Sequence, residues 1–279
     1  MARVRYVVLD FDGTCTQVDQ VEAGFLDQYR AALAIEKPRW EAAVARVRAA
    51  APKAGWTILG SPSTAPAAAD PYILAGETAA LLQREGTLGV IPGDLFGKIY
   101  GANVAPFRRE LADVLAALAS QRVRVGFISN SDGTAVGARL TDLLTANPKL
   151  RARIHVHGNA AKFTIKELPL ESKNPHRARF DALPGAQAIE GVGRPVYLRR
   201  AAYFEALCGM YQAFDEPGFP IADTLVCGDI WELDLAMPAA LGAQVHLIER
   251  AAPYPTYDYE RAQVGKGVSR DLKGLLKRL

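Results

Sequence analysis

Three apolar runs, each followed directly by polar side chains, constrain the fold of this chain more than any other feature. The first run is followed by Asp10 and Asp12, the second by Ser129 and Asn130, and the third by Asp229. Short runs that are apolar throughout are typical of strands buried on both faces of a parallel sheet. Because ligands bind at the carboxyl ends of such strands, these side chains should meet at one edge of the sheet.

The first of these ends, in the stretch VVLDFDGTCT, places two carboxylates only two residues apart. In extended backbone, residues i and i+2 point to the same face, so Asp10 and Asp12 would crowd together. Like charges at that range raise each other's pKa unless a cation or hydrogen bonds compensate them. With Asp229 expected at the same edge, we infer a divalent metal there, and hard oxygen ligands suit Mg²⁺.

The remaining pattern predicts an α/β protein in which helices cover a parallel sheet. Helices are expected near residues 22–34, 39–51, 73–84, 106–121, 134–146, 201–213 and 234–241. Strands are expected near residues 3–9, 123–128, 194–200, 224–227 and 243–249, and a further strand, within RARIHVHGNAAKF, is expected to end near residue 158. The stretch from Gly60 to Pro71 is rich in Pro, Ala and Ser and is expected to be an irregular loop.

Composition excludes several classes of protein. The 279 residues are 49% hydrophobic and 23% charged with a net charge of only +3, which is ordinary for a globular protein and gives no argument for nucleic acid. The apolar run at the N-terminus is too short for a signal peptide or a membrane span. Cys15, Cys208 and Cys227 form neither a metal-type pair nor a disulfide framework. We therefore expect a cytoplasmic protein without a membrane or nucleic-acid partner; the oligomeric state stays open.

Three motifs resemble those of the haloacid dehalogenase (HAD) superfamily. They are DFDGT at 10–14, FISNS at 127–131 and GDIWELD at 228–234, which correspond to the first, second and fourth motifs of the family. They occur in the family's order, and each follows an apolar run. The resemblance implies a Rossmann-like parallel sheet core flanked by helices, with an inserted, mainly helical cap.

The resemblance also implies roles for individual residues. Asp10 would be the nucleophile and a metal ligand. Asp12 would be the general acid and base, with its backbone carbonyl on the metal. Asp229 and Asp234 would hold Mg²⁺, and Ser129 would bind phosphate.

Two further features of the strand ends concern the phosphate. The Ser129 hydroxyl and the backbone N–H groups of Asn130 and Ser131, at the start of a helix, are suited to binding it. In relatives that cleave carbon–halogen bonds, the position of Asp12 is generally not an aspartate, so this residue points to phosphoryl transfer.

The third motif of the family, a basic residue that offsets charge at the nucleophile, is the hardest to locate. We favour Lys162, because it follows directly after a strand expected to end at the active edge. Arg194, which precedes a proline as the family's lysine often does, is the main alternative. The sequence offers three further candidates, namely Lys166, Lys173 and Arg199.

The insert between the first two motifs, residues 15–105, resembles the helical cap of many relatives. The catalytic core would then comprise residues 1–14 and 106–279, while the stretch 164–200 has no counterpart in the motifs. A cap excludes water and contacts the part of the substrate that does not react. A cap of this size implies a small-molecule substrate.

The sequence therefore predicts a Mg²⁺-dependent phosphatase that hydrolyses a small phosphorylated metabolite through an aspartyl-phosphate. One alternative is a phosphotransferase or phosphomutase with the same intermediate and a sugar hydroxyl as acceptor. A second alternative is a non-catalytic protein that keeps the fold and binds a ligand. The substrate itself cannot be read from the sequence.

Overall fold

The computed structural model describes residues 3–58 and 60–279, and a six-stranded sheet lies at its centre. The strand order is β10-β9-β8-β1-β4-β5, and every neighbouring pair is parallel. The strands are β1 (Tyr6–Leu9), β4 (Arg124–Ile128), β5 (Ile154–His157), β8 (Thr224–Gly228), β9 (Gln244–Ile248) and β10 (Val268–Ser269). The prediction of an α/β fold with a parallel sheet is confirmed.

Both faces of the sheet are covered, and β1 shows how the sequence achieves this. Tyr6 and Val8 belong to the apolar cluster on one face, whereas Val7 and Leu9 belong to the cluster on the other. Successive side chains of a strand point to opposite faces, so a strand covered on both sides must be apolar at every position. Helix α9 (Ala201–Ala213) packs in the first cluster, and α5 (Leu111–Ser120) and α6 (Gly133–Leu143) in the second.

Short elements complete this part of the chain. They are α7 (Pro148–Arg151), α8 (Arg177–Asp181), β6 (Ala186–Ala188), β7 (Pro195–Tyr197), a 3₁₀ turn (Ile221–Asp223), a π-helical turn (Trp231–Leu235), α10 (Ala236–Ala240), α11 (Asp258–Val264) and a 3₁₀-helix (Leu272–Arg278). The strand expected at 194–200 corresponds to β7, which pairs antiparallel with β6 outside the main sheet. The C-terminal amphipathic stretch is docked, because Leu272 and Leu275 are buried in the same cluster as α5.

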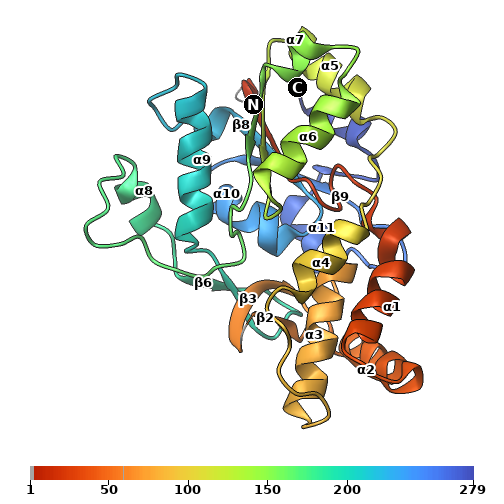
Figure 1. Ribbon diagram of the computed structural model, residues 1–279. Coiled ribbons are helices and arrows are strands. Elements are labelled where there is room, and N and C mark those ends of the chain that lie inside the picture. Colours follow the sequence, from red (N-terminus) through yellow and green to blue (C-terminus); the bar gives the residue numbers. More distant parts are fainter. Residues whose placement is uncertain (1–2, 59) are drawn as a thin grey trace.

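The insert forms a second group of elements in the lower part of Figure 1. It contains a 3₁₀ turn (Val18–Val21), α1 (Glu22–Ala32), α2 (Lys37–Ala50), β2 (Gly55–Ile58), β3 (Ser61–Pro66), α3 (Pro71–Arg84) and α4 (Leu95–Ala102). Its helices share an apolar cluster of their own. The chain enters and leaves side by side, since the Gln17 N–H donates to the Pro106 carbonyl (2.8 Å) and the Arg108 N–H to that of Cys15 (2.9 Å).

The expectation of an irregular loop from Gly60 to Pro71 is wrong. Residues Ser61–Pro66 form β3, which pairs antiparallel with β2, and Pro71 begins α3. Prolines disfavour central strands, but a two-stranded ribbon consists only of edge strands, where they are tolerated. Asp70 caps α3 by accepting a hydrogen bond from the Ile73 N–H (2.7 Å), and Pro71 at the start of the helix supplies a suitable φ.

The three cysteines are buried and free. Burial raises the pKa of each thiol above its ordinary value, which keeps the thiols protonated and unreactive. Across the described residues, no helix combines the length and the apolar character that a membrane crossing requires.

The packing of α5 against the sheet generates the first prediction. Replacing Leu115, which is fully buried, by alanine should lower the free energy of unfolding by about 2 to 5 kcal/mol, because it removes apolar contacts and leaves a cavity. The same change at Leu170, which is 92% exposed, should stay within about 0.5 kcal/mol of the wild type. Urea unfolding measures both variants, and equal losses at the two positions would contradict this packing.

Candidate active site

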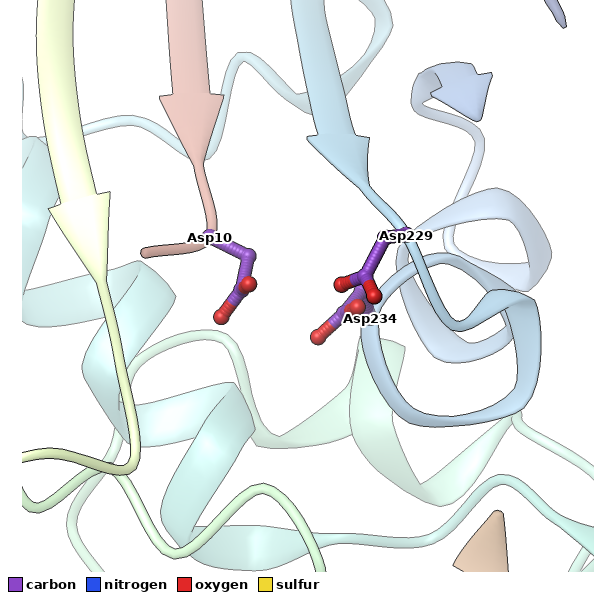
Figure 2. Close-up of side chains that lie close together, drawn as sticks. All are labelled: Asp10, Asp229 and Asp234. Carbon is purple, nitrogen blue, oxygen red and sulfur yellow. The ribbon is translucent and has the colours of Figure 1, made fainter. Parts of the chain in front are cut away.

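Three carboxylates meet where β1 and β8 end. Asp10 follows β1 directly, Asp229 follows β8, and Asp234 lies in the π-helical turn that comes next in the chain. Figure 2 shows the three side chains pointing toward one another. One oxygen of each lies within 4.8 Å of the others, a spacing at which a single cation can be bound by all three.

Lys162 joins this cluster from the loop after β5. Its Nζ lies 2.5 Å from Oδ1 of Asp10 and 2.5 Å from Oδ1 of Asp234, and the side chain is almost fully buried. Lys162 therefore lies beside Asp10 at the carboxyl edge of the sheet, and its role as the basic residue of the third motif stays a prediction. The guanidinium of Arg194 instead forms two 2.7 Å hydrogen bonds with the carboxylate of Glu232, in the loop between Asp229 and Asp234.

The charges of this cluster do not balance. Burial raises the pKa of Asp10 to about 7, and the nearby Asp234 adds to this rise while Lys162 opposes it. Burial raises the pKa of Asp229 well above its ordinary range, and Asp234 and Asp10 raise it further. Burial alone would lower the pKa of Lys162, but Asp10 and Asp234 more than reverse this effect. Three buried carboxylates thus share one lysine charge, and a cation would relieve their repulsion.

One oxygen of Asp229 is buried without a partner among the described residues, which supports the binding of such a cation. Its Oδ2 is buried and has no hydrogen-bond partner, whereas its Oδ1 accepts a bond from the Thr14 hydroxyl (3.2 Å). The same hydroxyl lies 2.9 Å from Oδ2 of Asp10, so its single proton is shared between the two carboxylates and links the two strand ends. A buried carboxylate oxygen without a donor is costly, and hard oxygen ligands of this kind suit Mg²⁺.

Gly13 allows the loop after β1 to approach Asp229 this closely. Its φ is +81°, a conformation that favours glycine, and an added Cβ would lie 2.4 Å from Oδ2 of Asp229. The glycine of the DFDGT motif is therefore required by the geometry of the carboxylate cluster.

Asp12 has partners of its own. Both oxygens of its carboxylate lie 3.1 Å from the Tyr100 hydroxyl, and the Ser131 hydroxyl donates to Oδ2. Burial raises the pKa of Asp12, and the hydrogen bonds from Ser131 and Tyr100 lower it in part. The structure therefore separates the carboxylate of Asp12 from the three-carboxylate cluster. No motif in the sequence pointed to Tyr100, which comes from α4 of the insert.

The loop after β4 is organised by its own side chains. Ser129 is buried, and its hydroxyl accepts a hydrogen bond from the Ser131 N–H (3.0 Å). The side-chain carbonyl of Asn130 accepts one from the Lys162 N–H (2.7 Å). Helix α6 begins only at Gly133, with Asp132 as its cap. Ser129 and Asn130 thus lie beside the cluster, and their binding of phosphate stays a prediction.

The loop that carries Asp229 and Asp234 is braced by residues that the sequence analysis did not single out. The carboxylate of Glu260 accepts a hydrogen bond from the Trp231 N–H (3.1 Å) and one from Arg250 (3.0 Å). Arg250 also donates to the Asp229 carbonyl. Glu260 lies in the first turn of α11 and Arg250 just after β9, so no local pattern predicts their meeting.

Known structures share this architecture. No protein-family model and no curated protein sequence matches the chain. YfnB from Bacillus subtilis, assigned as a HAD-hydrolase and solved bound to magnesium, is 17% identical with a TM-score of 0.51 over 99% of each chain. A Haemophilus somnus protein predicted to be a phosphoglycolate phosphatase is 15% identical with a TM-score of 0.54, over 100% of this chain and 99% of the other.

A third structure comes from a protein assigned as a mutase. A Thermotoga maritima protein assigned as a β-phosphoglucomutase is 9% identical with a TM-score of 0.54, over 99% of this chain and all of the other. Identities this low establish a shared fold. The chain has the fold of the HAD-like hydrolases, as its three motifs predicted.

The excess of buried carboxylates generates a prediction about Mg²⁺ binding. Because the pKa of Asp10 is raised to about 7 without metal, Asp10 must lose a proton for Mg²⁺ to bind at lower pH. The affinity for Mg²⁺ should therefore rise between about pH 6 and about pH 8, with proton release upon binding. Calorimetric titration in buffers of different ionisation enthalpy measures both quantities.

Two variants control this measurement. Asp229→Asn should weaken Mg²⁺ binding at least about tenfold, because it removes a charged ligand. Asp142→Asn, on the exposed surface of α6, should leave binding unchanged. Equal affinities in the wild type and Asp229→Asn would show that this cluster does not bind the metal.

Proposed function

We propose that the protein is a Mg²⁺-dependent phosphatase of a small phosphorylated metabolite and that it acts through an aspartyl-phosphate on Asp10. One observation carries the proposal: Asp10 lies at the end of a central strand within a cluster of acidic residues and one lysine. Nucleophile, charge compensation and metal ligands are the parts that this chemistry requires.

Each residue of the cluster has a task in the proposed reaction. A carboxylate oxygen of Asp10 attacks phosphorus while the bond from phosphorus to the leaving oxygen breaks. Asp12 gives its proton to that oxygen and later takes one from the water that releases phosphate from Asp10. Lys162 offsets negative charge beside Asp10, and Ser129 and Asn130 bind the phosphate.

The metal would be held by Asp10, Asp229 and Asp234 together with the backbone carbonyl of Asp12. When bound, Mg²⁺ reduces the repulsion between the anionic nucleophile and the anionic phosphate. The unpartnered Oδ2 of Asp229 supports this assignment. The magnesium bound to YfnB supports the choice of ion.

We further propose that residues 15–105 form the cap over a core of residues 1–14 and 106–279. The paired crossing of the chain near residues 15–17 and 106–108 supports this division. Tyr100 supports it as well, since this residue of the insert contacts Asp12. A covered site suits a small phosphate ester better than a nucleic acid or a membrane surface as the substrate. A cytoplasmic location remains the proposal that the free cysteines favour.

A phosphotransferase or phosphomutase remains the second candidate. The fold shared with the β-phosphoglucomutase-type protein favours it, because the same aspartyl-phosphate can pass to a sugar hydroxyl in place of water. Assays with candidate acceptors distinguish the two, since a transferase would form a new phosphate ester and release little phosphate. A protein that only binds a ligand would need none of the buried, charge-rich cluster.

Replacing the nucleophile tests the proposal. Asp10→Asn should lower Mg²⁺-dependent release of phosphate from p-nitrophenyl phosphate and a panel of metabolite phosphates by about 10³-fold or more, because the covalent step is lost. Asp142→Asn serves as the matched control and should keep the wild-type rate. EDTA should abolish turnover by the wild type.

The fold of each variant is checked by circular dichroism and its melting temperature. A folded Asp10→Asn variant with a rate near the wild-type value would contradict the mechanism. A wild type that hydrolyses nothing, alone or with acceptors, would favour the binding-protein alternative.

A further inference from the structure

Tyr100, a residue of the insert, contacts the carboxylate of Asp12 directly. It lies on α4 (Figure 1), and its hydroxyl contacts side chains of the loops after β1 and β4. Its hydroxyl is 3.1 Å from each oxygen of Asp12 and 2.9 Å from Oγ of Ser131. Ser131 in turn donates to Oδ2 of Asp12, so the three side chains form a closed ring of contacts.

The protons in this ring determine what it does. Tyr100 and Ser131 have one hydroxyl proton each, and Oδ2 of Asp12 can accept from them whether the carboxylate is ionised or carries on Oδ1 the proton for the leaving oxygen. If both hydroxyls donate to Asp12, the carboxylate is held from two sides. If Tyr100 instead donates to Ser131, then Ser131 donates to Asp12 and the chain of bonds still ends there. In either arrangement the direction of the carboxylate depends on the hydroxyl of Tyr100.

The two donors come from different parts of the chain. Ser131 follows β4 in the sheet, whereas Tyr100 is carried by the insert, where Leu95 and Ile99 anchor α4 in the apolar cluster. The ring of Tyr100 packs edge-on against Tyr72 (5.2 Å between centroids) and stacks on Phe96 (5.8 Å). The ring is therefore held by aromatic packing, which leaves the hydroxyl for Asp12.

We infer that Tyr100 is a positioning residue for Asp12: its hydroxyl aims the carboxylate at the leaving oxygen, so proton transfer depends on α4 being seated over the site. This inference rests on the proposed phosphatase function. It adds to that function a specific consequence, since substrates whose leaving group needs a proton depend on Tyr100 more than substrates whose leaving group does not.

The test uses a series of aryl phosphates that runs from p-nitrophenyl to p-methoxyphenyl phosphate. The p-nitrophenolate ion leaves without a proton, whereas the p-methoxyphenolate ion is a much poorer leaving group and relies on the general acid. The ratio kcat/KM reports only the steps up to departure of the leaving group, so the later hydrolysis of the aspartyl-phosphate does not enter. The variant is Tyr100→Phe, which keeps the ring and removes the hydroxyl.

We expect Tyr100→Phe to lower kcat/KM for p-methoxyphenyl phosphate at least about tenfold more than for p-nitrophenyl phosphate, within the range that general acid catalysis contributes. Ser131→Ala should shift the series in the same direction. Tyr29→Phe is the matched control: Tyr29 belongs to the same aromatic cluster, where it stacks on Trp40, and it should leave both rates unchanged.

The contrary outcomes are distinct. An equal fall for all esters would mean that Tyr100 supports only the structure of α4, and unchanged rates would mean that its hydroxyl is dispensable. Either result overturns the inference while wild-type turnover upholds the proposed function. A wild type that hydrolyses neither these esters nor the panel of metabolite phosphates overturns both.

Discussion

The site depends on one electrostatic constraint: three carboxylates are buried beside a single lysine. The pKa values of Asp10 and Asp229 are raised chiefly because burial disfavours their charged forms, and their mutual repulsion adds to this. Lys162 bridges two of the three carboxylates but cannot neutralise them all. A buried excess of negative charge is costly unless a further positive charge offsets it. The same excess charge therefore motivates both the proposed Mg²⁺ site and the proposed phosphatase function.

The parallel sheet makes this cluster out of residues far apart in the sequence. Strands β1 and β8 are neighbours in register, so the residues that follow them, Asp10 and Asp229, emerge side by side. The chain beyond β5 returns to the same edge and brings Lys162. Gly13 permits the close approach of the two loops, because no side chain would fit against Asp229. The strand ends thus supply both the acidic residues and the counter-charge.

A feature could be predicted from the sequence when the residues that define it are close together in the chain. The strand ends could be predicted because each apolar run and the polar residues after it are contiguous in the sequence. Lys162 could be expected at this edge of the sheet because it comes shortly after the end of β5. Tyr100 could not, because α4 meets Asp12 only through the packing of the insert. The ribbon of β2 and β3 was missed because its prolines suppress the strand signal, and only pairing in three dimensions reveals it.

The insert and the core are connected at the site in more than one place. Arg194 binds Glu232 in the loop between Asp229 and Asp234, and its Nε also donates to the Pro52 carbonyl of the insert (3.1 Å). The hydroxyl of Thr64 in β3 lies 3.4 Å from the carbonyl of Glu232. Arg194, the main alternative to Lys162 in the sequence analysis, thus links the insert to the loop that carries Asp229 and Asp234.

The most direct measurement of the central claim is to trap the covalent intermediate. The enzyme would be mixed with a phosphate ester and Mg²⁺, quenched in acid within its first turnovers, and digested for mass spectrometry. The account predicts one added phosphoryl group on the peptide that contains Asp10 and none in Asp10→Asn. Turnover without any phosphorylated peptide, or with the phosphoryl group on another residue, would contradict it.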